Sequence, residues 1–163
     1  MSGGVEVQVA VPGPSVPSES RFAEWAEAAA TELKGAFELS IRIVGPQESG
    51  RLNERYRGCR GPTNVLAFPA ELPDDLGLPL LGDLVICRQV VEREAAEQGK
   101  STEAHWAHMV VHGTLHLLGY DHVTADEAAR MEAREVQILA GLGYPDPYQE
   151  TDGGRPSARS AIE

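Results

Sequence analysis

The sequence of 163 residues predicts one α+β domain: a small mixed sheet of four strands, packed with about five helices around a three-histidine metal site. Short apolar or alternating segments are typical of strands, and longer segments with helical periodicity and capping residues are typical of helices. The two kinds do not alternate regularly along the chain. We expect the domain to span residues 1–148 and the polar residues 149–163 to form a disordered tail.

Four segments have the pattern of strands. Valine alternates with Glu6, Gln8 and Ala10 from Val5 to Val11, and residues 39–44 alternate in the same way. A third apolar segment lies between prolines within residues 62–69, and the fourth, residues 84–87, is continuously apolar, as in a strand that is buried on both faces. A loop rich in proline and glycine is expected over residues 71–80.

Five segments have the pattern of helices, and capping or helix-ending residues bound each one. They are residues 18–34 followed by Gly35, residues 46–56 with Pro46 first and Leu52 and Tyr56 as apolar contacts, residues 88–98 followed by Gly99, a histidine-rich helix capped by Ser101, and a last helix to about Ala140, with a capping box at Thr124 and Glu127 and with Gly141 and Gly143 at its end.

The histidine-rich helix organises the rest of the chain. Residues 104–120 contain no Asp, Glu, Lys or Arg, yet they include His105, His108, His112 and His116. A helix that is apolar nearly all round is a buried one, and steps of three and four place these imidazoles on one stripe. Buried imidazoles need polar partners, and a metal ion is one such partner.

The residues that follow suggest which imidazoles converge. His112 and His116 are one turn apart, and Gly119 is suited to end the helix in the left-handed conformation, so that His122 folds back toward its end. This spacing matches the zinc motif of metzincin peptidases, except that Gly113 stands where those enzymes have a catalytic glutamate. We therefore predict that His112, His116 and His122 bind a metal ion without the general base of a peptidase.

Four other polar residues near this helix have open interpretations. For His105 and His108 we favour partners within the core, because both lie away from the reversal at Gly119. Glu135 falls on the apolar stripe of the last helix, where it either finds a partner or points to water. Asp121 either orients a ligand imidazole or serves as a turn residue before His122.

Charge separates one segment from the rest of the protein. The net charge is −11, which argues against a non-specific binder of polyanions. Residues 51–61 nevertheless carry Arg51, Arg55, Arg57 and Arg60 against one glutamate, a local charge of +3. This segment is either a solvated helix face and loop or a clamp for phosphate, whose oxygens an arginine can bind in pairs.

Other features of composition indicate the setting in which the protein works. Two cysteines, Cys59 and Cys87, are too few for a disulfide scaffold and fit a reducing cytoplasm. No basic and apolar leader begins the sequence, and no uncharged segment has the length and composition of a membrane span, so we expect no membrane partner.

Several segments resemble the YbeY family of bacterial metal-dependent endoribonucleases that act in ribosomal RNA maturation. In chain order they are Leu52-Asn53, Tyr56-Arg57-Gly58, Pro62-Thr63-Asn64-Val65-Leu66, Leu81-Gly82-Asp83-Leu84-Val85-Ile86 and the histidine motif from His112 to His122. The resemblance covers residues 37–148, and the family's fold, a small mixed sheet with helices around a zinc site, agrees with the pattern of elements above.

This resemblance implies a function and a site. His112, His116 and His122 would hold one Zn²⁺ per chain, and Arg57 matches the family's functionally important arginine. The activity would be zinc-dependent cleavage of single-stranded RNA in maturation of the 16S ribosomal RNA 3′ end and in ribosome quality control, in the cytoplasm. The partners would be ribosomal RNA and the ribosome or its proteins, not DNA. Cys59-Arg60-Gly61 and Ala67 depart from the family pattern, which has an acidic residue and a serine there.

Two other functions are compatible with the same residues. One is a noncatalytic ribosome-assembly factor with a structural metal, which would need a fourth protein ligand in place of water. The other is a zinc hydrolase of another substrate class, such as a peptidase, against which Gly113 weighs because that position lacks a general base.

Overall fold

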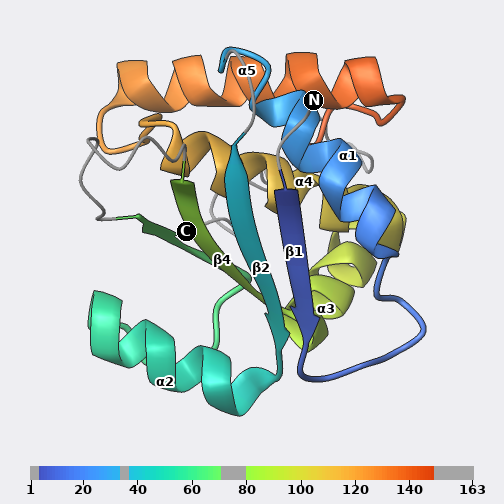
Figure 1. The fold of residues 1–163 in the computed structure, drawn as a ribbon, viewed down its shortest axis with the longest axis vertical. Helices are drawn as coiled ribbons and strands as arrows, with labels where there is room; N and C mark the ends of the chain where they lie inside the picture. Colours follow the sequence, from blue (N-terminus) through green and yellow to red (C-terminus); the bar gives the residue numbers. More distant parts are fainter. Residues whose placement is uncertain (1–3, 34–36, 71–79, 149–163) are drawn as a thin grey trace.

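Four strands form one mixed sheet in the computed structural model, which describes residues 4–33, 37–70 and 80–148 (Figure 1). The strands are β1 (Gly4–Val9), β2 (Glu38–Val44), β3 (Val65–Pro69) and β4 (Leu80–Cys87), in the order β1-β2-β4-β3. The first three in that order run parallel, and β3 pairs antiparallel with β4 at one edge. The α+β architecture and the four-stranded mixed sheet are therefore confirmed.

Two strands differ from the sequence prediction in length. β1 ends at Val9 rather than Val11, because the chain leaves the sheet before Pro12, which has no N–H for a strand ladder. β4 begins at Leu80 rather than Leu84, because its first half pairs with β2 on one side and with β3 on the other. The predicted tail over residues 149–163 and most of the predicted 71–80 loop lie outside the described residues.

Five helices accompany the sheet within the described ranges, as predicted. They are α1 (Glu19–Ala29), α2 (Pro46–Arg57), α3 (Arg88–Gln98), α4 (Thr102–Leu117) and α5 (Ala125–Leu142). α1 ends at Ala29 instead of continuing to Lys34, because turns follow in which Leu33 N donates to Ala30 O. None of the described helices combines the length and the apolar character needed to cross a membrane.

The last helix runs past one of the glycines expected to end it. Gly141 lies inside α5, and Gly143 adopts the left-handed conformation, with φ 96°, that closes the helix. The predicted capping box is present, since Thr124 and Glu127 each accept a hydrogen bond from the other's backbone.

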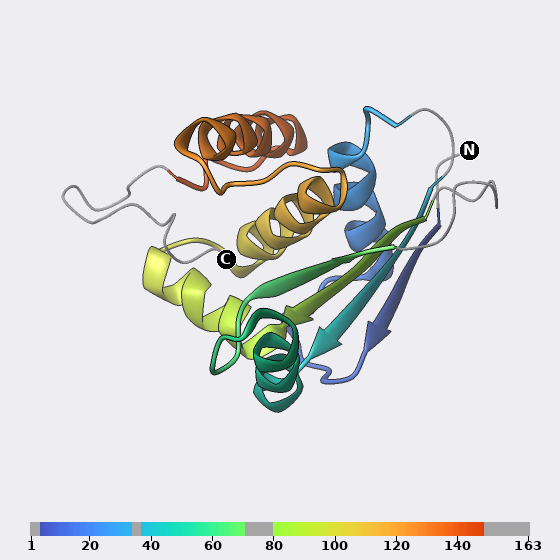
Figure 2. The same cartoon turned by 90° about the vertical axis from the view of Figure 1, so that its left-hand side faces the viewer.

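α4 lies between the sheet and α5, so that it is covered on both sides (Figure 2). Its apolar residues join Ile41, Leu84 and Ile86 from one face of the sheet in the main core. On the opposite face, Val85 and Leu66 form a smaller cluster against which Leu52 of α2 packs. Successive strand residues point to opposite faces, which places α2 and α4 on either side of β3 and β4.

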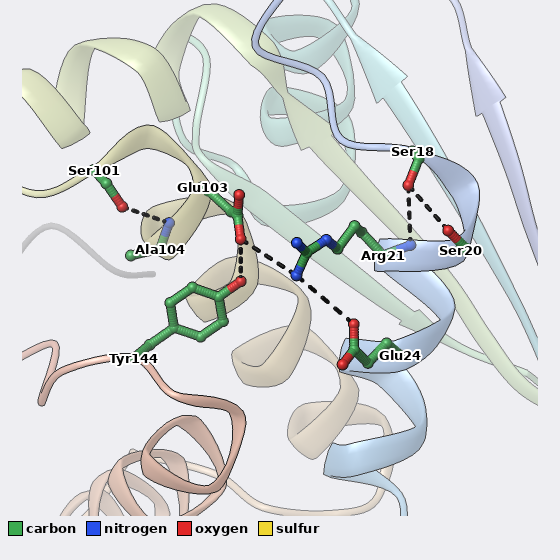
Figure 3. A network of polar contacts seen from close by, with 8 residues as sticks. All are labelled: Ser18, Ser20, Arg21, Glu24, Ser101, Glu103, Ala104 and Tyr144. Carbon is green, nitrogen blue, oxygen red and sulfur yellow. Dashed lines mark hydrogen bonds and ion pairs between the residues drawn. The ribbon is translucent and has the colours of Figure 1, made fainter.

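Polar side chains join the beginnings of α1 and α4 to the end of α5 (Figure 3). Ser101 caps α4 by accepting from Ala104 N, and Ser18 caps α1 in the same way. Glu103, in the first turn of α4, lies 3.4 Å from Arg21 of α1 and accepts a hydrogen bond of 2.5 Å from the Tyr144 hydroxyl. These contacts fix the end of α4 that lies away from the three clustered histidines.

Candidate metal centre and its cleft

The structure brings His112, His116 and His122 together. Each offers a ring nitrogen, and these nitrogens all lie within 4.8 Å of one another. His112 and His116 come from successive turns at the end of α4. Gly119, with φ 107°, then reverses the chain, and His122 returns to a ring-centroid distance of 4.9 Å from His116. The geometry is the one that the sequence predicted for this segment.

The three imidazoles fit a divalent transition metal. Nitrogens bound at about 2.0–2.1 Å to one tetrahedral zinc ion lie about 3.4 Å apart, and the three nitrogens here all lie within 4.8 Å of one another. Burial, together with the neighbouring His112 and His122, lowers the pKa of His116 to about 4. This ring is therefore neutral at pH 7, the form in which imidazole binds metal.

The cluster contains three residues and not four. Among the residues that the structure describes, no cysteine or carboxylate joins the three histidines. Asp121 serves the turn, because its Oδ1 accepts a 2.7 Å hydrogen bond from the backbone N–H of His122. Three protein ligands beside an open space are typical of catalytic zinc sites, whereas structural sites have four.

Glu135 of α5 is the partner of one of these histidines. Its side chain is fully buried, and Oε2 accepts a 2.6 Å hydrogen bond from His112 Nδ1. Oε1 accepts from His108 Nε2 at 2.8 Å and also from the Tyr148 hydroxyl. With Nδ1 engaged in this way, Nε2 is the nitrogen through which His112 can coordinate a metal ion. The carboxylate thus selects both the tautomer and the orientation of the ring.

Hydrogen bonds keep the buried Glu135 carboxylate ionised. Burial by itself would raise the pKa of this group, but the hydrogen bonds from His108 and His112 outweigh it and lower the pKa below its usual range. The sequence showed an acidic residue on an apolar helix stripe but not its partner, because the contact joins residues of two helices that lie 23 positions apart in the sequence.

The other two histidines of α4 have partners in the core, as the sequence analysis favoured. His105 Nε2 lies 2.8 Å from Oε1 of the buried Glu94, and His108 shares Glu135 with His112. Burial lowers the pKa of both imidazoles, to about 4 for His108. Neither belongs to the three-histidine cluster.

Gly113 lies where α4 packs closely on the sheet. A Cβ atom built at this position would lie 2.6 Å from Leu84 Cδ2 and 3.3 Å from Val65 Cγ2. A larger residue at this position would therefore require a shift of Leu84 or of the helix. A glutamate at the metzincin position would meet the same contact.

An open cleft of about 470 Å³ borders the histidine cluster. It follows the edge strand β3 between the end of α2 and the reversal after α4. Its walls consist of Tyr56, Arg57, residues 65–69, His112, Gly113, His116 and residues 121–123. The three histidines and Arg57, which the sequence singled out separately, therefore face one space.

Two buried polar side chains of α2 hold the arginine-rich segment in place. Ser49 Oγ donates to Thr63 O and accepts from Thr63 N, both at 3.0 Å. Asn53 Nδ2 donates to Gly61 O at 2.9 Å. These contacts anchor the helix to the loop before β3, so that Arg57, its last residue, lies at the cleft.

The arginines of residues 51–61 all lie on the surface, as do the loop residues around them. In contrast, the expectation that Tyr56 supplies an apolar contact is only partly right. Its side chain is 57% exposed, and its ring meets that of Phe68 edge to face at a centroid distance of 5.2 Å. Tyr56 lies on the same face of α2 as Ser49 and Asn53, but in the last turn of the helix, where it is exposed although those two residues are buried.

The chain is an α+β domain with three histidines and an arginine on the walls of one cleft. These features place it in a class of small proteins with a candidate three-histidine metal centre. Comparison with known families is more specific. The family model described as Endoribonuclease YbeY matches residues 14–143, and the chain belongs to this family. The family relation thus makes the protein an endoribonuclease by class.

A solved structure shows the same fold. The solution structure of TM1509 from Thermotoga maritima superimposes with a TM-score of 0.55 at 23% sequence identity. The match covers 94% of this chain and 100% of the other. At this level of identity, the likeness concerns the fold.

Proposed function

We propose that this protein is a zinc-dependent endoribonuclease that cleaves single-stranded RNA, with one zinc ion held by His112, His116 and His122. The observation that carries the proposal is the convergence of three imidazole nitrogens within 4.8 Å on the wall of an open cleft. Membership of the endoribonuclease family supports the reaction class.

The residues around the cleft have distinct roles in this proposal. A bound zinc ion would supply Lewis-acid activation of water and of the phosphodiester. Arg57 would bind the phosphoryl oxygens and stabilise the negative charge that develops on them. Glu135 would hold His112 in the orientation and tautomer that binding requires. Arg57 thus acts on the substrate, and Glu135 acts through a ligand.

The proposed substrate is ribosomal RNA, with roles in maturation of the 16S 3′ end and in ribosome quality control in the cytoplasm. Family membership and the resemblance of residues 37–148 support this assignment. The net charge of −11 limits general attraction to RNA, since affinity depends on the number of phosphates that a protein neutralises. We therefore propose that contacts with the ribosome or its proteins add to the binding supplied by the arginine-rich segment.

The proposal is tested with a labelled RNA that covers the 3′ end of 16S ribosomal RNA, offered single-stranded and as a duplex. Elemental analysis first identifies the metal, and a chelator then removes it. We expect cleavage of the single strand alone, its loss after chelation and its return with zinc. Undiminished cleavage by metal-free protein would overturn the mechanism. Digestion of a peptide library instead of RNA would favour the other hydrolase class.

A further inference from the structure

We propose that the exposed ring of Tyr56, supported by Phe68, is a stacking platform for one unpaired nucleobase of an RNA strand that occupies the cleft. This inference rests on the proposed function and adds to it the group that recognises a base. It assigns a substrate-binding role to a residue outside the histidine cluster and next to Arg57.

The Tyr56 ring is exposed and lies at the cleft. Among the described residues, the large apolar side chains that are exposed are Val9, Tyr56 and Val123. A single exposed tyrosine is ordinary on a protein surface. Here, however, both Tyr56 and Val123 line the cleft of the histidine cluster, whereas Val9 lies on β1 at the other edge of the sheet. Two of these three exposed residues thus lie at the cleft.

Phe68 supports the Tyr56 ring. Tyr56 and Phe68 meet at 72° with their centroids 5.2 Å apart, an edge-to-face contact that favours one orientation of the tyrosine. Phe68 itself is half-buried against the cluster beneath α2. The ring contact therefore connects the last turn of α2, which carries Tyr56, to β3, which carries Phe68. A ring held in this way loses little conformational freedom when a base stacks on it.

Positive charge lies close to the Tyr56 ring. The Arg55 guanidinium lies over the Tyr56 ring, 5.5 Å from its centroid, which leaves the other face of the ring for a base, and Arg57 follows directly in the sequence and lines the cleft. Aromatic rings flanked by arginines are the composition of surfaces that bind single-stranded nucleic acid, in which bases stack and phosphates meet the cations. An apolar peptide would gain nothing from these charges, so the observations favour RNA as the occupant.

The platform also gives a physical basis for selecting single strands. In a duplex, each base has its faces covered by the neighbouring bases, so a protein ring has no face on which to stack. An unpaired nucleotide exposes that face at little cost. Because Tyr56 and the three histidines border the same cleft, a strand stacked on Tyr56 would have a nearby phosphodiester at the metal centre.

The test compares Tyr56→Ala with Tyr56→Phe in the full-length, zinc-loaded protein. For cleavage of a single-stranded RNA, we expect Tyr56→Ala to raise the half-saturating RNA concentration about 5- to 150-fold, the effect of losing one base–aromatic stack. Tyr56→Phe keeps the ring and is expected to change that value less than about twofold. Zinc content and the thermal midpoint should match those of the unmodified protein, because the side chain is mostly exposed.

A series of RNAs, each lacking one base, separates stacking from a structural role. One abasic position should weaken binding to the unmodified protein by the same factor as Tyr56→Ala, and the two changes together should weaken it no further. Additive losses at every position would overturn the inference, as would equal half-saturation of Tyr56→Ala and the unmodified protein.

Two measurements together distinguish this inference from the proposed function. Fluorescence anisotropy with a chelator present, which stops metal-dependent cleavage, measures RNA binding, and the zinc-loaded protein is assayed for RNA cleavage. If the protein binds single-stranded RNA through Tyr56 but never cleaves it, the platform stands and the nuclease assignment fails. If the protein cleaves RNA equally well with and without the ring, the nuclease assignment stands and the platform fails. If it neither binds nor cleaves RNA, both fail.

Discussion

Glu135 Oε2 and His112 Nδ1 lie 2.6 Å apart, in a hydrogen bond that joins α5 to the metal-binding end of α4. The carboxylate is fully buried and also accepts a hydrogen bond from His108. One acidic residue thus connects a core imidazole with a candidate metal ligand. The last helix is therefore part of the site, although it contributes no ligand itself.

Replacement of Glu135 by glutamine should weaken zinc binding about 10- to 100-fold, because the neutral amide orients His112 less strongly and makes its ring less basic. Competition with a chromophoric chelator measures the affinity. Glu97→Gln is the matched control, since Glu97 is exposed on α3 and makes only a 3.9 Å ion pair with Arg93. Equal zinc affinity for both variants would contradict the orienting role of Glu135.

Replacement of His116 by alanine should remove both the zinc and the RNA cleavage, because two imidazoles remain of the three that form the site. Zinc content by elemental analysis and cleavage of labelled RNA provide the two measurements. A metal-free His116→Ala protein that still cleaves RNA would exclude the proposed metal mechanism.

Replacement of Arg57 by alanine should leave zinc content unchanged and lower the cleavage rate about 10²- to 10³-fold, as expected for loss of one group that stabilises the transition state. Arg57→Lys should recover only part of this rate, since lysine keeps the charge but lacks the two-pronged donor geometry. Loss of zinc from Arg57→Ala would show instead that this residue supports the metal centre.

Replacement of Gly113 by alanine should lower the free energy of unfolding by about 1–3 kcal/mol, because the new Cβ would lie 2.6 Å from Leu84 Cδ2. Gly141→Ala is the control. Gly141 lies within α5 with no atom within 4 Å of an added Cβ, so this change should raise stability by about 0.5–1 kcal/mol. Urea unfolding measures both, and equal effects would contradict the packing argument.

Acid should destabilise the metal-free protein between pH 6.5 and about pH 4. Burial lowers the pKa of His108 to about 4 in the folded protein, whereas its ordinary value is 6.5. Between these values the unfolded chain binds the extra proton, so the free energy of unfolding falls as pH falls, by up to about 1.4 kcal/mol per pH unit for this group. The pKa of His105 and that of His116 are lowered in the same direction.

Urea unfolding at a series of pH values gives the slope of stability against pH. Well above pH 6.5 these histidines should contribute no further dependence, because both states are then unprotonated. Stability that stays constant from pH 6.5 to pH 4, or that increases toward acid, would show that the imidazoles are not buried as the structure places them.

The sequence by itself determined the local elements and the spacing of the candidate ligands. Alternation in β2, the capping box at Thr124 and the left-handed glycine at position 119 act over a few residues, so each could be inferred without the fold. His112, His116 and His122 also lie within one helix end and one turn. Their convergence was therefore a property of a short segment.

Only the tertiary structure decided the contacts between distant segments. It placed Glu135 against His112, packed Gly113 on Leu84, and brought Tyr56 and Arg57 to the same cleft as the histidines. The partner of a buried polar group depends on which elements become neighbours when the core packs, and periodicity along the chain carries no record of that choice.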